Sequence, residues 1–131
     1  MTSDYKILIR EHHLDSYGHV NNATYLSLFE EARWEIITQK GYGYAHVHKT
    51  GLGPVILEVN MVFLKELKLR EMITINLEVA SHKGKITHLI QKMIKENGEL
   101  ACELKIVSGL FNLRERKLID PTDEWKAVLG L

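Results

Sequence analysis

Residues 22–40, with the sequence NATYLSLFEEARWEIITQK, decide the fold, because their apolar positions recur with the period of an α-helix. One broad face carries the apolar side chains Tyr25, Leu28, Phe29, Ala32, Ile36 and Ile37. Polar residues such as Glu31 lie largely on the opposite face. Asparagine is a favoured helix cap, so Asn21 or Asn22 is expected to start the helix, and Gly41 is expected to end it. The pattern predicts one amphipathic helix of about five turns.

Outside this helix the hydrophobic period changes to two, which is typical of half-buried strands. Strands are predicted over five segments, one before the helix and four after it: residues 5–13, 55–63, 73–79, 85–95 and 100–113. In the second segment one face is expected to carry Val55, Leu57, Val59, Met61 and Phe63. Asn97 and Gly98 form a two-residue hairpin signal, since both positions of such a turn need positive φ.

Two remaining segments have weaker patterns. Residues 41–54 are predicted to form a loop that accommodates a short helical turn, and residues 121–129 a short C-terminal helix with Pro121 in its first turn. One long helix and five strands predict an α+β fold, with an antiparallel sheet wrapped around a central helix in a single domain, 1–131. Such a sheet covers the helix on one side only, so a homodimer or homotetramer is expected.

Composition argues against several functions. The 131 residues carry 17 basic and 17 acidic side chains, which disfavours a nucleic-acid binder or an anionic-membrane binder. No apolar stretch approaches the roughly 20 residues of a transmembrane helix, and the first residues lack the apolar core of a signal peptide, so a cytoplasmic location is expected. The single cysteine, Cys102, excludes an internal disulfide. The histidine pairs lack the spacing of a ligand set, so no metal site is predicted.

Residues 15–22, with the sequence DSYGHVNN, carry the candidate chemistry. They lie directly before the predicted helix, where free N–H groups and the helix dipole favour a developing negative charge. Asp15, a few residues upstream, has the chemistry of a general base or a nucleophile. The same residues also suit a purely structural role, with Asp15 in a turn and Gly18 chosen for its backbone freedom.

The segment Asp15–Tyr25, together with F-E at 29–30 and A-R at 32–33, resembles the signature of the hot-dog-fold acyl-CoA thioesterases. The 4-hydroxybenzoyl-CoA thioesterase-like branch has approximately D-x-x-G-H-V-N-N-x-x-Y followed by F-E-x-A-R. The tripeptide at 53–55 is also similar, and the resemblance covers about residues 5–113 in the order and length of the elements. It implies a hot-dog fold, with a five- or six-stranded antiparallel sheet around one long helix. It also implies hydrolysis of an acyl-CoA thioester without a cofactor.

The resemblance assigns Asp15 as the catalytic aspartate, which acts as a nucleophile or as the base that activates water. The helix N-terminal backbone near Asn22 is the implied oxyanion donor. Four further positions are implied to lie against the substrate: Gly18, His19, Asn21 and Tyr25. Some hot-dog thioesterases use a helix glutamate instead, and Glu30, Glu31 and Glu35 are available here, although solvated charges are the simpler interpretation.

Basic residues cluster at two predicted turns, Lys83 with Lys85 and Arg114 with Arg116. Coenzyme A brings phosphate groups that such side chains can bind, and ordinary solvated charges are the alternative. Two other functions stay open: an acyl-carrier-protein thioesterase and a non-catalytic acyl- or CoA-binding hot-dog module. Asp15 argues against the binding module, because a binder needs no carboxylate beside the carbonyl. A dehydratase on the same fold is disfavoured, because the motif resembles the thioesterase one.

Overall fold

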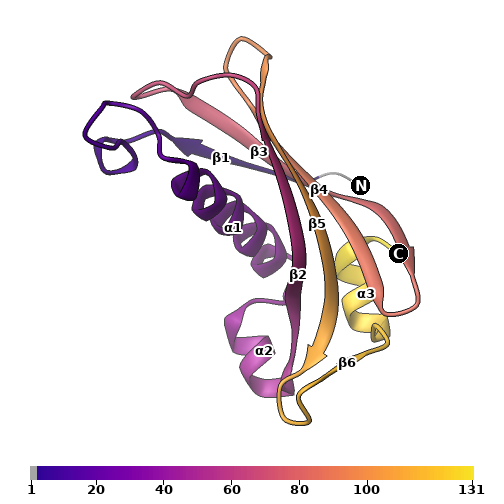
Figure 1. Ribbon diagram of the computed structural model, residues 1–131. Helices are drawn as coiled ribbons and strands as arrows, with labels where there is room; N and C mark the ends of the chain where they lie inside the picture. Colours follow the sequence, from indigo (N-terminus) through magenta and orange to yellow (C-terminus); the bar gives the residue numbers. More distant parts are fainter. Residues whose placement is uncertain (1–2) are drawn as a thin grey trace.

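A computed structural model describes residues 3–131, which form six strands and three α-helices (Figure 1). In chain order the elements are β1 (Ser3–Leu8), a 3-10 helix (Glu11–His13), α1 (Asn22–Gln39), α2 (Tyr44–Thr50), β2 (Leu52–Phe63), β3 (Met72–Lys83), β4 (Ile86–Ile94), β5 (Leu100–Asn112), β6 (Lys117–Ile119) and α3 (Asp123–Leu129). All pairings are antiparallel, in the order β1-β3-β4-β5-β2, and β6 pairs with β5. The predicted α+β arrangement is confirmed.

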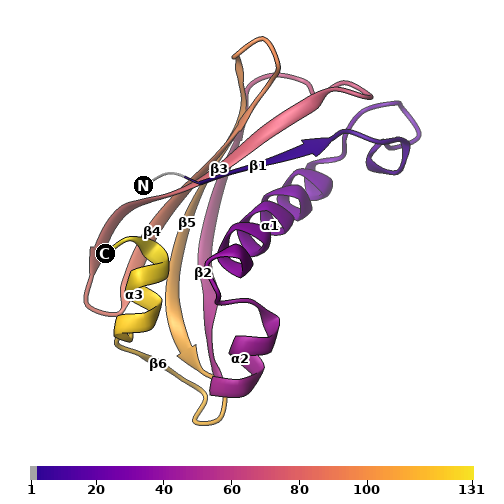
Figure 2. The ribbon, with the colours of Figure 1, turned by 180° about the vertical axis from the view of Figure 1, so that it is seen from behind.

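Helix α1 lies along the concave side of the curved sheet (Figure 2). All six apolar positions predicted for its packing face are buried, and they form one core with residues of the central strands, such as Ile75 and Leu104. Burial of each leucine, isoleucine or phenylalanine side chain contributes roughly 1.5–3 kcal/mol by removing it from water. The Asn21 side chain accepts a hydrogen bond from the Ala23 amide at 2.9 Å, and Gly41 has a φ of 87° just after the helix. The predicted helix is therefore confirmed to within one residue.

A buried polar link fixes the middle of α1 to β4. Arg33 Nη1 donates to Gln91 Oε1 at 2.9 Å, and Gln91 Nε2 donates to the Phe29 carbonyl at 3.1 Å. Burial lowers the pKa of Arg33, and the nearby Glu30 opposes this shift. Because a buried polar group that loses its partner costs about 1–3 kcal/mol, this link holds the helix in one position on the sheet.

The first strand ends earlier than predicted. The sequence pattern predicts a strand over 5–13, whereas β1 stops at Leu8. The next residue, the buried Ile9, accepts a hydrogen bond at 2.7 Å from the Arg70 amide, which lies just before β3. The chain then enters the 3-10 helix, where the ring of His13 accepts a backbone N–H. Tertiary hydrogen bonding thus replaces strand pairing at this point.

For residues 55–63, the predicted inner face is wrong on the N-terminal side of a β-bulge. The register of β2 against β5 shifts between Ile56 and Glu58. Antiparallel partners share a face of the sheet, so the β5 residues buried beneath α1 identify the inner face of β2. That inner face carries Pro54, Ile56, Val59, Met61 and Phe63. Val55 lies on the outer face and Leu57 at the bulge, because one extra residue reverses the alternation.

The hairpin before β5 and the C-terminal helix also differ in detail from the prediction. Gly98 has a φ of 88°, but Asn97 does not have a positive φ. The Gly98 amide donates to the Lys95 carbonyl at 2.9 Å, so the connection is a longer turn that ends in a glycine bulge. Helix α3 is capped by the Thr122 side chain, so Pro121 precedes the cap and does not lie in the first turn.

Two short elements lie where the sequence pattern is weak. Helix α2 occupies the middle of the predicted loop over 41–54, and β2 already begins at Leu52. Strand β6 was not predicted, because three residues are too few to show a period. It continues the sheet beside β5 and connects β5 to α3.

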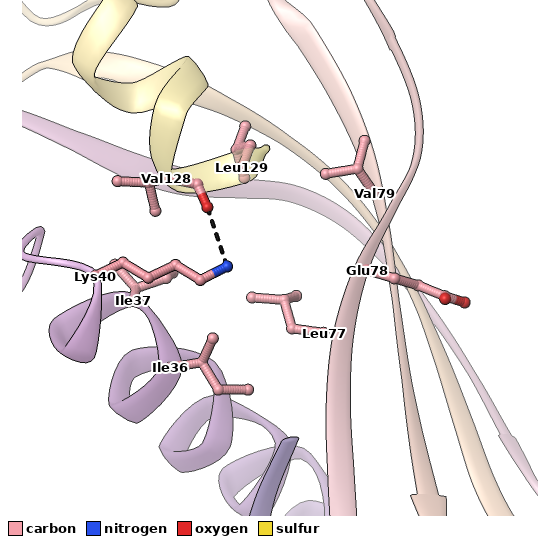
Figure 3. A pocket seen from close by; sticks show the side chains of 8 residues that line it. All are labelled: Ile36, Ile37, Lys40, Leu77, Glu78, Val79, Val128 and Leu129. Carbon is pink, nitrogen blue, oxygen red and sulfur yellow. Dashed lines mark hydrogen bonds between the residues drawn. The ribbon is translucent and has the colours of Figure 1, made fainter. Parts of the chain in front are cut away.

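The C-terminal ends of α1 and α3 meet over β3 (Figure 3). Lys40 Nζ donates to the Val128 carbonyl at 3.2 Å and joins the two helices. The side chains around this small hollow are mostly apolar, among them Ile36 and Leu77. This hollow lies at the opposite end of α1 from the loop over 15–22, so it belongs to the packing of α3.

Candidate active site

The loop before α1 is closed by the Asp15 side chain. Asp15 Oδ1 accepts the backbone amides of Tyr17 at 2.9 Å and His19 at 3.1 Å. The backbone closes the same loop, since the Asp15 amide donates to the His19 carbonyl at 2.8 Å and Gly18 adopts a φ of 78°. The structural role expected of a turn aspartate is therefore present. It occupies Oδ1 and leaves Oδ2 without a hydrogen-bond partner among residues 3–131.

The first turn of α1 leaves one backbone donor free. Asn21 is the cap: its side chain accepts the Ala23 amide, and its carbonyl accepts the amides of Thr24 and Tyr25 at 2.9 and 3.2 Å. The Asn22 N–H finds no acceptor in the described part of the chain. A free amide at a helix N-terminus is suited to bind an oxygen that carries negative charge.

A groove of about 430 Å³ opens beside this helix end. Its lining comes from the loop before α1, from α1 itself, and from the end of β2 with the residues that follow: His19, Val20, Asn22, Tyr25, Phe63, Leu64, Lys65 and Glu66. The structure thus brings three of the predicted site residues, His19, Asn22 and Tyr25, to one groove. Asp15 is not a lining residue, but its carboxylate is bonded to the backbone of His19.

Sequence analysis missed the second wall of this groove, residues 63–66. This segment is anchored from β5, since Ala101 O accepts the amides of both Leu64 at 2.8 Å and Lys65 at 3.0 Å. Glu66 Oε1 lies 3.3 Å from His19 Nε2 and thereby connects the two walls. No local pattern marks these residues, because only the pairing of β2 with β5 brings them to the helix N-terminus.

Tyr25 is a wall residue rather than an ionisable participant. Its side chain is buried, and its ring contacts the Phe63 ring edge to face with the centroids 5.0 Å apart. Burial raises the pKa of Tyr25, and the backbone of Leu67 opposes the shift. The phenol therefore stays neutral at physiological pH, which suits packing against an apolar group.

The predicted phosphate-binding residues lie at the other end of the sheet. Lys83 and Lys85 flank the turn between β3 and β4, and Arg114 and Arg116 lie in the turn between β5 and β6 (Figure 1). Arg114 Nη2 donates to the Lys49 carbonyl at 3.3 Å. Within one chain, none of these four side chains lines the groove.

The other candidate residues form no second catalytic or metal-binding site within residues 3–131. Glu30, Glu31 and Glu35 are exposed on α1, and Glu31 accepts the Tyr5 hydroxyl at 2.9 Å. Among residues 3–131, no group of three or more His, Cys, Asp or Glu side chains is arranged to hold a metal ion. Within the same range, no helix has both the length and the apolar character needed to cross a membrane.

A curved antiparallel sheet around one long helix, with Asp15 in the loop before the helix N-terminus, is the arrangement of the hot-dog fold. Residues 9–129 match the thioesterase-like superfamily, and the chain belongs to this family. The resemblance found in the sequence, the hot-dog fold and the class of thioester hydrolase are confirmed.

Two similar proteins agree with this family, and a third shares the fold. It is 28% identical over 116 residues to the long-chain acyl-CoA thioesterase FadM of Escherichia coli, covering 87% of this chain and 86% of the relative. The crystal structure of YbaW, a probable thioesterase from Escherichia coli, is 27% identical with a TM-score of 0.83, covering 96% of this chain and 95% of that one. SAV2348 of Staphylococcus aureus, solved in complex with CoA, shares the fold at 18% identity with a TM-score of 0.91, covering 99% of this chain and 82% of that one.

Proposed function

We propose that this protein hydrolyses acyl-CoA thioesters to a free carboxylic acid and coenzyme A. The observation that carries the proposal is the pair of groups without a hydrogen-bond partner among residues 3–131, the Asn22 amide and Asp15 Oδ2. The amide belongs to a residue that lines the groove, and Asp15 lies in the loop before it. The similarity to a long-chain acyl-CoA thioesterase supports CoA as the thiol part of the substrate. The CoA-bound relative of the same fold supports it as well.

In the proposed reaction, the thioester carbonyl oxygen accepts a hydrogen bond from the Asn22 N–H. The helix dipole adds to the stabilisation of the oxyanion as the carbonyl carbon becomes tetrahedral. Asp15 Oδ2 takes a proton from the attacking water, or attacks the carbon itself to form an anhydride that water then opens. In both routes the C–S bond breaks, the oxyanion returns to a carbonyl, and the thiolate leaves as coenzyme A.

A second copy of the chain is proposed to cover the edge strand β2. The inner-face side chains Ile56 and Val59 of this strand are 41% and 43% exposed, although they point to the same side as the core. Strand β2 is also the last strand of its sheet, so its outer backbone groups are free to pair. An apolar, unpaired edge of this kind favours a homodimer, or a homotetramer built from such dimers.

This arrangement gives the basic turns a role across the subunit boundary. If two β2 strands pair antiparallel about a twofold axis, the start of one strand lies beside the end of the other. Arg114 and Arg116 follow directly on the residues that pair with the start of β2. We propose that these arginines from one copy approach the CoA phosphates bound at the groove of the other. Lys83, at the end of β3, and Lys85, just before β4, lie further from this edge and are less well placed.

A thiol-release assay across a panel of acyl-CoAs tests the proposal. Cys102 does not interfere with such an assay, because it is buried and burial raises the pKa of its thiol to about 12. Thiol release that disappears in the Asp15→Asn variant supports the proposal. Activity only with acyl-carrier-protein thioesters would assign the protein to that substrate instead. Tight acyl-CoA binding without any hydrolysis would identify a binding module.

A further inference from the structure

The wall of the groove that contains Phe63 is positioned by strand pairing, and its surface is exposed. Phe63 is the last residue of β2 and pairs with Cys102 of β5. The two residues that follow it are both bonded to the carbonyl of Ala101. The backbone is therefore held on both sides of Phe63, and the ring is presented to the groove from a rigid strand end.

A second aromatic ring braces the Phe63 ring. Tyr25 lies behind it in edge-to-face contact and is only 6% exposed, whereas Phe63 is 48% exposed. The two rings thus differ in role: one is fixed in the core, and the other has a free face toward the groove. Edge-to-face pairs contribute about 0.5–1.5 kcal/mol beyond the area that they bury, which helps to keep the exposed ring in place.

Phe63 also marks a boundary along the inner face of β2. It is the only inner-face residue of that strand that lines the groove. The next two inner-face residues, Met61 and Val59, continue the apolar surface but lie outside the groove. Along the inner face of β2, Phe63 therefore lies between the groove and a further apolar strip formed by Met61 and Val59.

We propose that Phe63, braced by Tyr25, is the specificity-determining residue that limits the length of the acyl chain. The inference rests on the proposed thioesterase function and deepens it by assigning an aliphatic acyl group to the apolar side of the groove. With the thioester carbonyl at Asn22, the acyl chain runs along Val20 and Tyr25 and ends against Phe63. The polar side, with His19, remains for the pantetheine arm.

The test compares acyl-chain profiles of two neighbouring truncations in the full-length protein. Phe63→Ala opens the groove toward the apolar strip, so kcat/KM for the longest chains should rise relative to short chains by about tenfold or more, as expected when a pocket gains room for additional methylenes. Val62→Ala is the matched control, because Val62 is 45% exposed on the same strand but does not line the groove. Its profile should remain that of the wild type.

A third variant keeps the test decisive if Phe63→Ala folds poorly. Phe63→Trp enlarges the wall and should shorten the longest accepted chain, with activity on short chains kept. Equal profiles in wild type, Phe63→Ala and Phe63→Trp would overturn the inference, as would an equal shift in Val62→Ala. Failure of the proposed function looks different, because the wild type would then release no thiol from any acyl-CoA.

Discussion

The regions around the two ends of β2 differ in whether their polar groups have hydrogen-bond or ion-pair partners. At the groove end, one carboxylate oxygen of Asp15 and the amide of Asn22 have no hydrogen-bond partner within residues 3–131. The other Asp15 oxygen and the Asn21 side chain accept backbone amides at 2.9–3.1 Å. At the opposite end, the charged groups are occupied locally. Arg114 donates to a backbone carbonyl, and the Lys117 ammonium lies 3.2 Å from Glu115.

This difference distinguishes a site that is suited to catalysis from a surface that is suited only to binding phosphate. A reaction needs donors and acceptors that are positioned but not satisfied, because their missing partner is the transition state. A surface that only holds phosphate needs flexible cations in reach of solvent. The predictions below test whether the two ends of β2 differ in this way.

The largest effect is expected at Asp15. In Asp15→Asn the amide oxygen can still accept the amides of Tyr17 and His19, so the loop should keep its shape. The negative charge at the second carboxylate oxygen is lost, and kcat should fall by roughly 10²–10⁴-fold, the usual contribution of a positioned base. Thiol release with a good acyl-CoA substrate measures this, and circular dichroism checks the fold. A folded variant with near wild-type kcat would remove Asp15 from the mechanism.

The next effect concerns the exposed inner face of β2, which connects the two ends. Val59→Asp places a carboxylate where a second copy is proposed to pack. An unpaired buried charge costs about 3–5 kcal/mol, so the dissociation constant of the assembly should rise by roughly two to four orders of magnitude. Light scattering should then show a particle near the 15.1 kDa of one chain.

The control for Val59→Asp is Asn60→Asp, which adds the same charge to the outer face one residue away. The control should keep the assembly of the wild type. An unchanged assembly in both variants, or a wild type that is already a monomer at micromolar concentration, would contradict the proposed use of β2.

A smaller effect, on KM, is expected at the turn between β5 and β6, which carries Arg114 and Arg116. Replacing Arg114 and Arg116 together by alanine should raise KM for acyl-CoA by about tenfold, since exposed charge pairs contribute up to about 1 kcal/mol each. The value of kcat should be kept, because these contacts are the same in the ground state and the transition state. The Lys83→Ala/Lys85→Ala double variant should change KM less. Unchanged KM in both double variants would make all four side chains ordinary surface residues.

Sequence reasoning recovered the elements that depend on local pattern. The helix over 22–40 was predicted to within one residue because its period and its caps are local, and the loop over 15–22 could be identified for the same reason. The second wall of the groove, residues 63–66, could not be predicted. Glu66 reaches His19 only because β2 pairs with β5, which is a long-range event. The bulge near Ile56 also left no signal in the alternation and reversed the predicted face of the residues before it.

The smallest effect is expected at Glu66, the residue that connects the two walls of the groove. The side chains of His19 and Glu66 are 61% and 57% exposed, so their contact should add no more than about 1 kcal/mol to the free energy of unfolding. Glu66→Gln should leave the unfolding midpoint nearly unchanged. Because the pair lies across the groove, KM for acyl-CoA should still change, by less than about fivefold.

The matched control for Glu66→Gln is Glu11→Gln. Glu11 pairs with Arg70 at 2.7 Å, its side chain is similarly exposed, and neither of these two residues lines the groove. Both variants remove one surface carboxylate, so a change in overall charge would affect them equally. A shift in KM that is confined to Glu66→Gln would show that the contact between His19 and Glu66 belongs to the substrate groove. Equal KM values in both variants would mean that the contact between His19 and Glu66 only joins two surface segments.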